Sequence, residues 1–526
     1  GSAPRSLALA PSGRIWVVNK GASSISIVSP DTLTVAQTVA LPRASMPYGI
    51  VIGADGVAYV TLEATGQVLR IDANGAAGTP ATVAPNVRHL ALNAAGTQLL
   101  VARFVTPPLP GEATATVSPT ASTGAEVRVL TPSTLVQQRN IVLQNSTTSD
   151  NTVQGRGIPN YLGAPVISPD GRSAWVPSKQ DNVQRGRLRD GLDLDFQNTL
   201  RAISSRIDLT TQAEDLAGRI DHDNSGQASA AAFHPNGAYL FVALEASRHV
   251  AVVDAVGQRE LFRVDTGRAP EGLAVSADGL TLYVHNFMDR SVGVYDLSRL
   301  VRYGESLLPL ATTMSSVASE KLSATVLRGK QLFYDARDTR LSRDAYISCA
   351  GCHNDGGHDG RTWDFTGFGE GLRNTISLRG RAAVQGRLHW SANFDELQDF
   401  EGQIRSLAQG SGLMTDAQFN TGTRSQPLGD PKAGVSTDLD ALAAYVASLN
   451  TADPTPYRQA DGSLTTAAVA GRSVFAAQCI SCHGGADFTD SAGGALRNIG
   501  TLKASSGNRL GGALTGIDTP TLRDVW

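Results

Sequence analysis

The chain has 526 residues, more than a single hydrophobic core serves, so two or three domains are expected. Its formal net charge is −3, which gives no electrostatic case for binding nucleic acid or an anionic membrane surface. No apolar run approaches the roughly 18 residues of a membrane-spanning helix, and no charged and apolar leader opens the chain. Residues 1–3 fit either a mature terminus after cleavage or a cloning scar.

The first three hundred residues repeat one unit: an apolar strand, a glycine turn, a second apolar strand and then a third. Glycine supplies the positive φ that a tight hairpin requires. The turn glycines are spaced by 43, 40, 75, 66 and 42 residues, so the period is about 42, with insertions near residues 105–125 and 180–202. These glycines are Gly13, Gly56, Gly96, Gly171, Gly237 and Gly279.

A four-stranded unit of this length is typical of a blade of a β-propeller. Six copies are visible, so the sequence predicts six or seven blades over residues 1–301. The unit resembles the YVTN-type repeats of bacterial surface and periplasmic propellers, with the nearest matches at 59–61 and 283–286. We expect a scaffold or docking surface, because no acid–base or metal cluster stands out. Residues 221–226 begin like a calcium loop, but Ala232 replaces its final glutamate, which favours a solvated acidic loop.

After a connector at residues 302–322, the pattern becomes helical, and two Cys-x-x-Cys-His motifs use all four cysteines of the chain. Each motif follows a predicted helix containing Gly-x-x-x-Phe, and an amphipathic helix over 438–450 closes the first unit. The sequence therefore predicts two mainly α cytochrome c domains, at 323–450 and 451–526. The motif residues are Cys349, Cys352 and His353, followed by Cys479, Cys482 and His483.

This spacing suits two covalently bound haem c groups. Two thiols three positions apart form thioether bonds to the haem vinyl groups, and the next residue, histidine, is the axial ligand of the iron. Two copies that consume every cysteine disfavour zinc binding or a chance match. Such attachment takes place outside the cytoplasm, so we expect an exported, periplasmic or extracellular protein whose signal peptide is not in the sequence.

Residues 323–526 resemble the bacterial di-haem cytochrome c peroxidases, the superfamily that includes MauG. The similarity is carried by segments 329–335, 341–344, 347–353, 373–378, 389–390 and 518–523. The resemblance implies that Trp390 is an electron bridge between the haems. It also implies that Asn374 and the region of Thr519 hold Ca²⁺ between the two haem domains. The alternatives are a core position for Trp390 and a turn or helix cap for Asn374.

Two departures from the family pattern concern the distal ligands. The peroxidases carry a glutamate just before a methionine on the distal side of the first haem, but residues 410–414 read Gly-Ser-Gly-Leu-Met, and Glu401 does not match that position. The family also continues beyond the position of Trp526 with the sixth ligand of the second haem, so further chain or another ligand is expected. For the first haem, an open or water-bound site is one alternative, and the candidate sixth ligands are Met414, His389 and His358.

Two redox functions follow from these features. The first is a di-haem cytochrome that transfers electrons to or from a redox partner protein or a small electron donor, with the propeller as a docking surface. The absent glutamate favours this function. The alternative is a peroxidase/MauG-type oxidoreductase that reduces peroxide or oxidises a protein substrate, which the overall resemblance favours. A purely structural or adhesive role has little support, because haem is costly to install on a structural protein.

Overall fold

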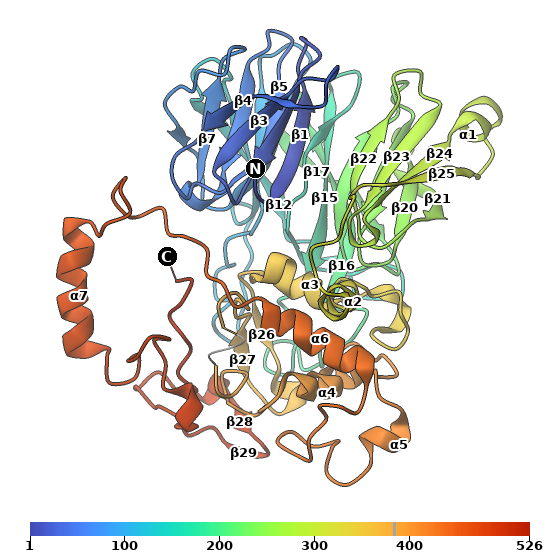
Figure 1. Cartoon of the computed structure of the whole chain (residues 1–526). Coiled ribbons are helices and arrows are strands. Elements are labelled where there is room, and N and C mark those ends of the chain that lie inside the picture. The colour runs from blue at the N-terminus through green and yellow to red at the C-terminus, as the bar shows by residue number, and fades with distance from the viewer. Residues whose placement is uncertain (382–384, 526) are drawn as a thin grey trace.

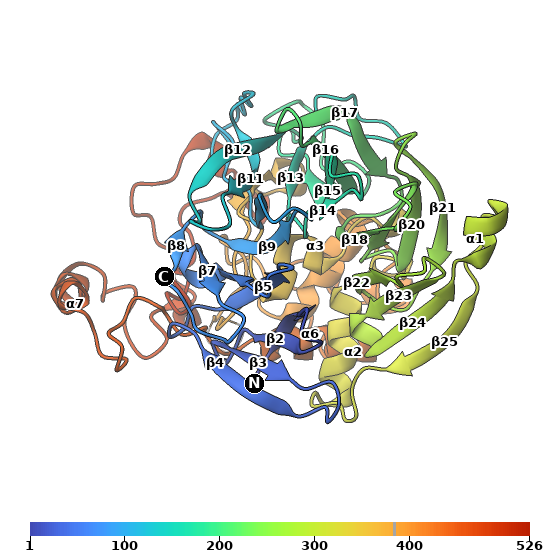
Figure 2. The same ribbon diagram turned by 90° about the horizontal axis from the view of Figure 1, so that it is seen from above.

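The computed structural model describes residues 1–381 and 385–525, and Trp526 lies outside the described residues. Residues 4–315 form six β-sheets arranged around a common axis (Figure 2). The remaining residues lie mainly against one end of this ring (Figure 1). The N-terminal half is therefore a six-bladed β-propeller, which decides between the six and seven blades expected from the repeat.

Every blade is an antiparallel sheet whose strands follow chain order. Blade 1 contains β1 (Pro4–Leu9), β2 (Ile15–Asn19), β3 (Ser24–Val28) and β4 (Val35–Ala40). Blade 2 contains β5 (Pro47–Ile52), β6 (Ala58–Leu62), β7 (Gln67–Ile71) and β8 (Ala81–Thr82). Blade 3 contains β9 (Val87–Leu92), β10 (Leu99–Arg103), β11 (Gly124–Leu130) and β12 (Gln137–Gln144).

The other three blades follow the same plan, and only blade 4 has an additional short strand. Blade 4 contains β13 (Ile158–Asn160), β14 (Val166–Ile167), β15 (Ser173–Asp181), β16 (Leu200–Asp208) and β17 (Ala213–His222). Blade 5 contains β18 (Ala228–Phe233), β19 (Tyr239–Leu244), β20 (His249–Asp254) and β21 (Arg259–Asp265). Blade 6 contains β22 (Pro270–Val275), β23 (Thr281–Asn286), β24 (Ser291–Asp296) and β25 (Leu310–Ser315).

Five of the predicted turn glycines lie between the first two strands of a blade, and Gly171 lies between the short strand β14 and β15 of blade 4. All six have positive φ, from 65° to 79°, a conformation that glycine adopts without a steric cost. The two predicted insertions are also present: the first joins β10 to β11 and the second joins β15 to β16. The periodicity of the sequence therefore located both the blades and their exceptions.

The connector is shorter than the expected residues 302–322, because β25 lies within that range. This strand pairs with β24 and completes blade 6. All six of its residues are exposed, so it lacks the alternation of buried and exposed positions by which a strand is recognised in sequence. Helix α1 (Ser298–Tyr303) precedes it.

Apolar side chains fill the junctions between consecutive blades, from blades 1 and 2 through to blades 5 and 6. Among the described residues, no such cluster joins blade 6 to blade 1. On the blade 1 face that points away from blade 2, Leu9, Ile15, Val28 and Val35 form one cross-strand row. Leu9 is 68% exposed, and Tyr283 of blade 6 is 37% exposed. The ring is thus open at this junction (Figure 1).

The second half is built around two packed helices, α2 (Ala324–Phe333) and α6 (Thr437–Ser448). They match the opening and closing helices that the sequence predicts for the first haem unit. A Cβ atom at Gly329 would lie 1.8 Å from the carbonyl oxygen of Ala441, so a glycine is required where the two helices cross. The rings of Phe333 and Tyr445 pack edge to face with centroids 5.1 Å apart.

Short elements make up the rest of this half. The helices are α3 (Cys349–His353), α4 (Glu401–Ser406), α5 (Asp416–Phe419) and α7 (Thr466–Gln478), and the strands are β26 (Thr362–Asp364), β27 (Leu372–Asn374), β28 (Asn508–Arg509) and β29 (Gly512–Ala513). Single 3₁₀ turns are η1 (Glu63–Thr65), η2 (Phe287–Asp289), η3 (Arg343–Ala345), η4 (Asn354–Gly356), η5 (Thr366–Phe368), η6 (Leu397–Phe400), η7 (Ser491–Gly493) and η8 (Ala504–Ser506).

The segment expected to form a second cytochrome domain is extended. Helix α7 has no buried residue and stands apart from the helices of the first haem unit (Figure 1). Within residues 451–525, the structure therefore does not show a second compact domain. Over the described part of the chain, no helix is long and apolar enough to cross a membrane.

Candidate haem sites

The first Cys-x-x-Cys-His motif forms the short helix α3. The hydroxyl of Ser348 caps it by accepting a hydrogen bond from the backbone N–H of Gly351, 3.2 Å away. The imidazole of His353 donates through Nδ1 to the carbonyl of Gly357 at 3.2 Å, and no hydrogen bond to Nε2 occurs among the described residues. A backbone carbonyl that fixes Nδ1 in this way directs Nε2 to a metal.

The second motif repeats this arrangement. Nδ1 of His483 lies 3.0 Å from the carbonyl oxygen of Phe488, so Nε2 is again the nitrogen left for iron. Cys479 and Cys482 are free thiols, as are both cysteines of the first motif. Two unpaired thiols and one oriented imidazole are the groups that haem c requires, so both motifs fit this cofactor.

The two cysteines of the first motif belong to different apolar clusters. Cys349 packs against the core of the helical domain. Cys352 instead packs with Leu109 from the first propeller insertion and with Val183 and Leu194 from the second. Burial raises the pKa of the Cys349 thiol to about 11 and the pKa of the Cys352 thiol well above its usual value. The insertions that interrupt the repeat thus form a wall beside the first motif.

The loop after His353 enters the polar end of the propeller. The carboxylate of Asp355 lies 3.1 Å from Arg5 of β1 and 3.5 Å from Arg88 of β9. Burial alone would raise the pKa of Asp355, but these two guanidinium groups outweigh it and hold the pKa well below its usual range. Arg88 also pairs with Glu63, which accepts a further hydrogen bond from Lys20 at 2.7 Å.

The sequence predicts a solvated acidic loop at residues 221–226. In the structure this loop is instead part of the interface between the propeller and the second half of the chain. Arg201 lies 2.8 Å from Asp221 and 3.0 Å from Asp223. The hydroxyl of Tyr346, just before the first motif, donates to Asp223. Arg201 therefore pairs with both carboxylates, and Tyr346 joins this group to the segment that carries the first motif.

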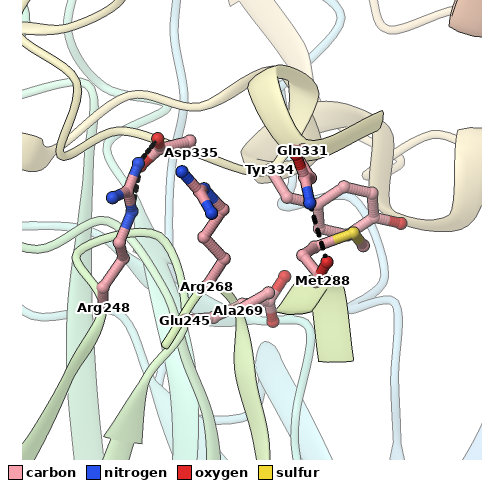
Figure 3. A pocket seen from close by; sticks show the side chains of 8 residues that line it. All are labelled: Glu245, Arg248, Arg268, Ala269, Met288, Gln331, Tyr334 and Asp335. Atoms are coloured by element: carbon pink, nitrogen blue, oxygen red, sulfur yellow. Dashed lines mark hydrogen bonds and ion pairs between the residues drawn. The ribbon is translucent and has the colours of Figure 1, made fainter. Parts of the chain in front are cut away.

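Further polar contacts hold α2 against blades 5 and 6 around a small pocket (Figure 3). Arg248 donates through Nε to Asp335 at 3.0 Å, and Gln331 donates to the carbonyl of Met288 at 3.0 Å. Glu245 is 4% exposed, and burial followed by the charge of Glu271 raises its pKa well above the usual value. The propeller and the first haem unit thus share an extensive charged interface.

Of the candidate sixth ligands, Met414 is 3% exposed and belongs to the same apolar cluster as Cys349. Its backbone N–H donates to Oε1 of Glu401 at 3.1 Å. Oε1 of Glu401 also accepts from Arg405 at 2.9 Å, and Oε2 accepts from the N–H of Leu413 at 2.9 Å. The structure therefore brings Glu401 next to Met414, with both carboxylate oxygens engaged in holding the loop.

The two histidine candidates differ from Met414. Nδ1 of His389 lies 2.8 Å from Oδ1 of Asn393, and its Nε2 lies 3.3 Å from the amide nitrogen of Gln403. Both ring nitrogens of His389 are thus engaged within the protein. His358 is exposed, and its Nδ1 accepts the N–H of Gly360 at 3.1 Å.

Trp390 lies where the first haem unit meets the C-terminal segment. Its indole Nε1–H donates to the carbonyl of Asn374 at 3.0 Å, and its own carbonyl accepts from the N–H of Asp518 at 2.8 Å. The structure thus brings together Trp390, the backbone of Asn374 and the residue next to Thr519. Asp518 lies more than a hundred positions after the other two residues in sequence.

The calcium expectation has weaker geometric support. The side chain of Asn374 is exposed. Asp518 is 2% exposed, and its Oδ1 is buried without a hydrogen-bond partner. Among the described residues, no group of three or more His, Cys, Asp and Glu side chains is arranged to hold a metal ion.

Sequence reasoning missed the propeller residues nearest the first motif. The Tyr161 hydroxyl donates to the carbonyl of Cys352 at 2.8 Å, and the Lys179 ammonium lies 3.3 Å from the Asp359 carboxylate. One sequence signal could have indicated these residues. Lys179 and Asp181 lie on the same face of β15, a strand whose residues are all buried. Buried charged side chains require partners of opposite charge.

Residues 323–461 match the family model CCP_MauG, described as di-haem cytochrome c peroxidase. A search of curated proteins finds no match. Among solved structures, the hydrazine synthase of Kuenenia stuttgartiensis is similar at 15% identity and a TM-score of 0.37, over 56% of this chain and 95% of that one. A functionally unknown protein from Desulfotomaculum acetoxidans is similar at 15% identity and a TM-score of 0.38, over 57% of this chain and 78% of that one.

The family match and the fold together show that the chain joins a six-bladed propeller to a domain of the di-haem peroxidase type, which supports haem-dependent oxidoreductase activity.

Proposed function

We propose that this chain is an exported di-haem c-type cytochrome that transfers electrons. One haem c is bound by Cys349, Cys352 and His353, and the other is bound by Cys479, Cys482 and His483. The observation that carries the proposal is the repeated geometry of the two motifs, in which a backbone carbonyl holds Nδ1 of each histidine. The bound haem supplies one-electron oxidation and reduction at its iron.

Electron transfer is preferred over peroxide chemistry because of Glu401. A residue that moves a proton on the distal side needs a carboxylate free to accept and release it. Both oxygens of Glu401 are occupied by Arg405 and by the N–H groups of Leu413 and Met414. Its role is to position the loop that carries Met414.

Met414 is the preferred sixth ligand of the first haem. It is buried in the cluster that contains Cys349, whereas both ring nitrogens of His389 are paired and His358 is exposed. A thioether ligand from Met414 would favour the reduced iron, which suits an electron carrier. In this arrangement Trp390 bridges the two haem-bearing segments, and Ca²⁺ near Asn374 and Thr519 would draw on the unpartnered oxygen of Asp518.

The alternative is a peroxidase/MauG-type enzyme that acts on peroxide or on a protein substrate. The family match over residues 323–461 favours it. In both cases the propeller is a docking surface for a redox partner, and covalent haem attachment implies a periplasmic or extracellular location.

Electronic spectroscopy of the holoprotein separates these functions. If the protein is an electron carrier, the first haem is six-coordinate and low-spin in both oxidation states, and the reduced protein does not turn over peroxide. A high-spin first haem together with peroxide turnover by a reduced donor would support the enzyme and refute the carrier. The second haem serves as an internal reference in the same spectra.

A further inference from the structure

Lys179 is a buried cation at the boundary between the propeller and the first haem motif. Its ammonium is fully buried, 2.9 Å from Asp181 on the same strand and 3.3 Å from Asp359 of the haem domain. It also lies 4.5 Å from the centre of the Tyr161 ring. Taking such charges out of water costs several kcal/mol per ion, so a buried cluster of this kind is weak evidence for a stabilising role.

This cluster is connected directly to the haem-binding motif. Tyr161, which packs against the Lys179 ammonium, donates its hydroxyl to the carbonyl of Cys352 at 2.8 Å. Asp359 follows His353 in the same loop and accepts a further hydrogen bond from the indole of Trp363 at 3.1 Å. The charges of the propeller are therefore held in a fixed position relative to Cys352 and His353.

The side chain of Tyr161 contacts both the Lys179 ammonium and the carbonyl of Cys352, so the charged pair lies close to the motif. Because the cluster is buried, salt in the solvent screens it far less than it screens a surface charge.

We propose that Lys179 and Asp181 of the propeller set the reduction potential of the haem at the first motif, with Tyr161 as the positioning residue that ties the motif to this pair. The inference rests on the proposed function, because it requires haem c at Cys349, Cys352 and His353. Reduction transfers one electron from an external donor to the iron and lowers its positive charge by one. A fixed positive charge nearby therefore favours the reduced form, and a negative charge favours the oxidised form.

Opposite substitutions in this pair have opposite expected effects. Asp181→Asn removes a negative charge, keeps the shape of the side chain and raises the potential of one haem. Lys179→Met removes the positive charge and lowers it. Each change is expected to alter the reduction equilibrium constant of that haem about tenfold, or about 59 mV for a one-electron couple. The double variant restores the net charge of the cluster and returns the potential toward that of the original protein.

Redox titration of the full-length holoprotein at about pH 8, followed by visible absorbance, measures both couples together. The exposed Lys321→Met is the matched control and leaves both potentials unchanged. Tyr161→Phe keeps the ring beside Lys179 but removes the hydrogen bond to the Cys352 carbonyl, and the absorbance spectrum of the same haem reports the effect.

A protein with fewer than two haems would refute the proposed function. Two intact haems with unchanged potentials in both Asp181→Asn and Lys179→Met would overturn this inference alone.

Discussion

The hydroxyl of Tyr161 in the propeller donates a hydrogen bond to the main-chain carbonyl of Cys352, 2.8 Å away in the haem domain. A residue nearly two hundred positions upstream thus holds the backbone between Cys352 and His353. Together with the paired Asp355 and the insertions around Cys352, this contact makes the propeller part of the surroundings of the first Cys-x-x-Cys-His motif.

Asp355→Asn is expected to loosen the haem domain from the propeller. Removing one partner of a buried ion pair leaves uncompensated charge and costs about 3–5 kcal/mol of unfolding free energy. Here Arg5 loses the carboxylate, while Arg88 keeps its pair with Glu63. Urea denaturation followed by fluorescence measures this loss. The exposed Asp31→Asn is the control and is expected to change stability by less than about 0.5 kcal/mol.

Asp355 also predicts an acid dependence of stability. Its folded pKa lies well below its unfolded value of about 3.9, so its stabilisation is fully present above the unfolded value and is lost progressively as the pH falls from there toward the folded pKa. In Asp355→Asn the unfolding free energy should fall less steeply between about pH 5 and pH 3 than in the original protein. Equal slopes in the two proteins would show that the carboxylate is not paired in solution.

The open junction between blades 6 and 1 predicts that two leucines of the propeller differ in importance. Leu62 is fully buried between blades 1 and 2, and truncation to alanine should cost about 2–5 kcal/mol. Leu9 is 68% exposed at the open junction, and its truncation should cost less than about 0.5 kcal/mol. Thermal unfolding compares the two variants, and a large loss in Leu9→Ala would mean that the junction is closed in solution.

Met414→Ala tests the distal side of the first haem. If Met414 is the sixth ligand, its removal converts one of two low-spin haems to a high-spin form and lowers its potential. Absorbance and electron paramagnetic resonance report the change. The exposed Met314→Ala is the control. A low-spin spectrum that survives in Met414→Ala and is lost in His358→Ala would assign the ligand to histidine instead.

Trp390→Phe tests the bridge between the haem-bearing segments. The indole contacts the backbone of Asn374 and its main chain contacts Asp518, so its removal should slow electron exchange between the haems. A tenfold loss of rate corresponds to about 1.4 kcal/mol of barrier. Stopped-flow reduction of the first haem with detection at the second measures this exchange rate. Trp16→Phe in the propeller core is the matched control variant. Unchanged exchange would leave Trp390 with a packing role only.

Much of this architecture was predictable because it is local in sequence. Each turn glycine, such as Gly13, needs only its neighbours to form a hairpin, and its spacing from the next gives the blade period. The Cys-x-x-Cys-His motifs are local in the same sense. β25 was missed because its outer-edge position leaves no buried face to produce alternation.

The surroundings of the first Cys-x-x-Cys-His motif could not be predicted, because they depend on how two domains dock. Lys179 and Asp359 are 180 residues apart and meet only when the haem loop enters the propeller. The same holds for Asp355 with Arg5 and Arg88. The open junction between blades 6 and 1 could not be predicted either, because the apolar row at Leu9 has the same sequence pattern as a buried blade face.

The most direct measurement is the intact mass of the exported holoprotein, combined with its absorbance spectrum. The proposed function predicts a mass increase equal to two haems and a Soret band, with one haem lost in Cys479→Ala/Cys482→Ala and the other in Cys349→Ala/Cys352→Ala. Protein recovered after export with unmodified cysteines and no Soret absorbance would contradict the assignment of both motifs.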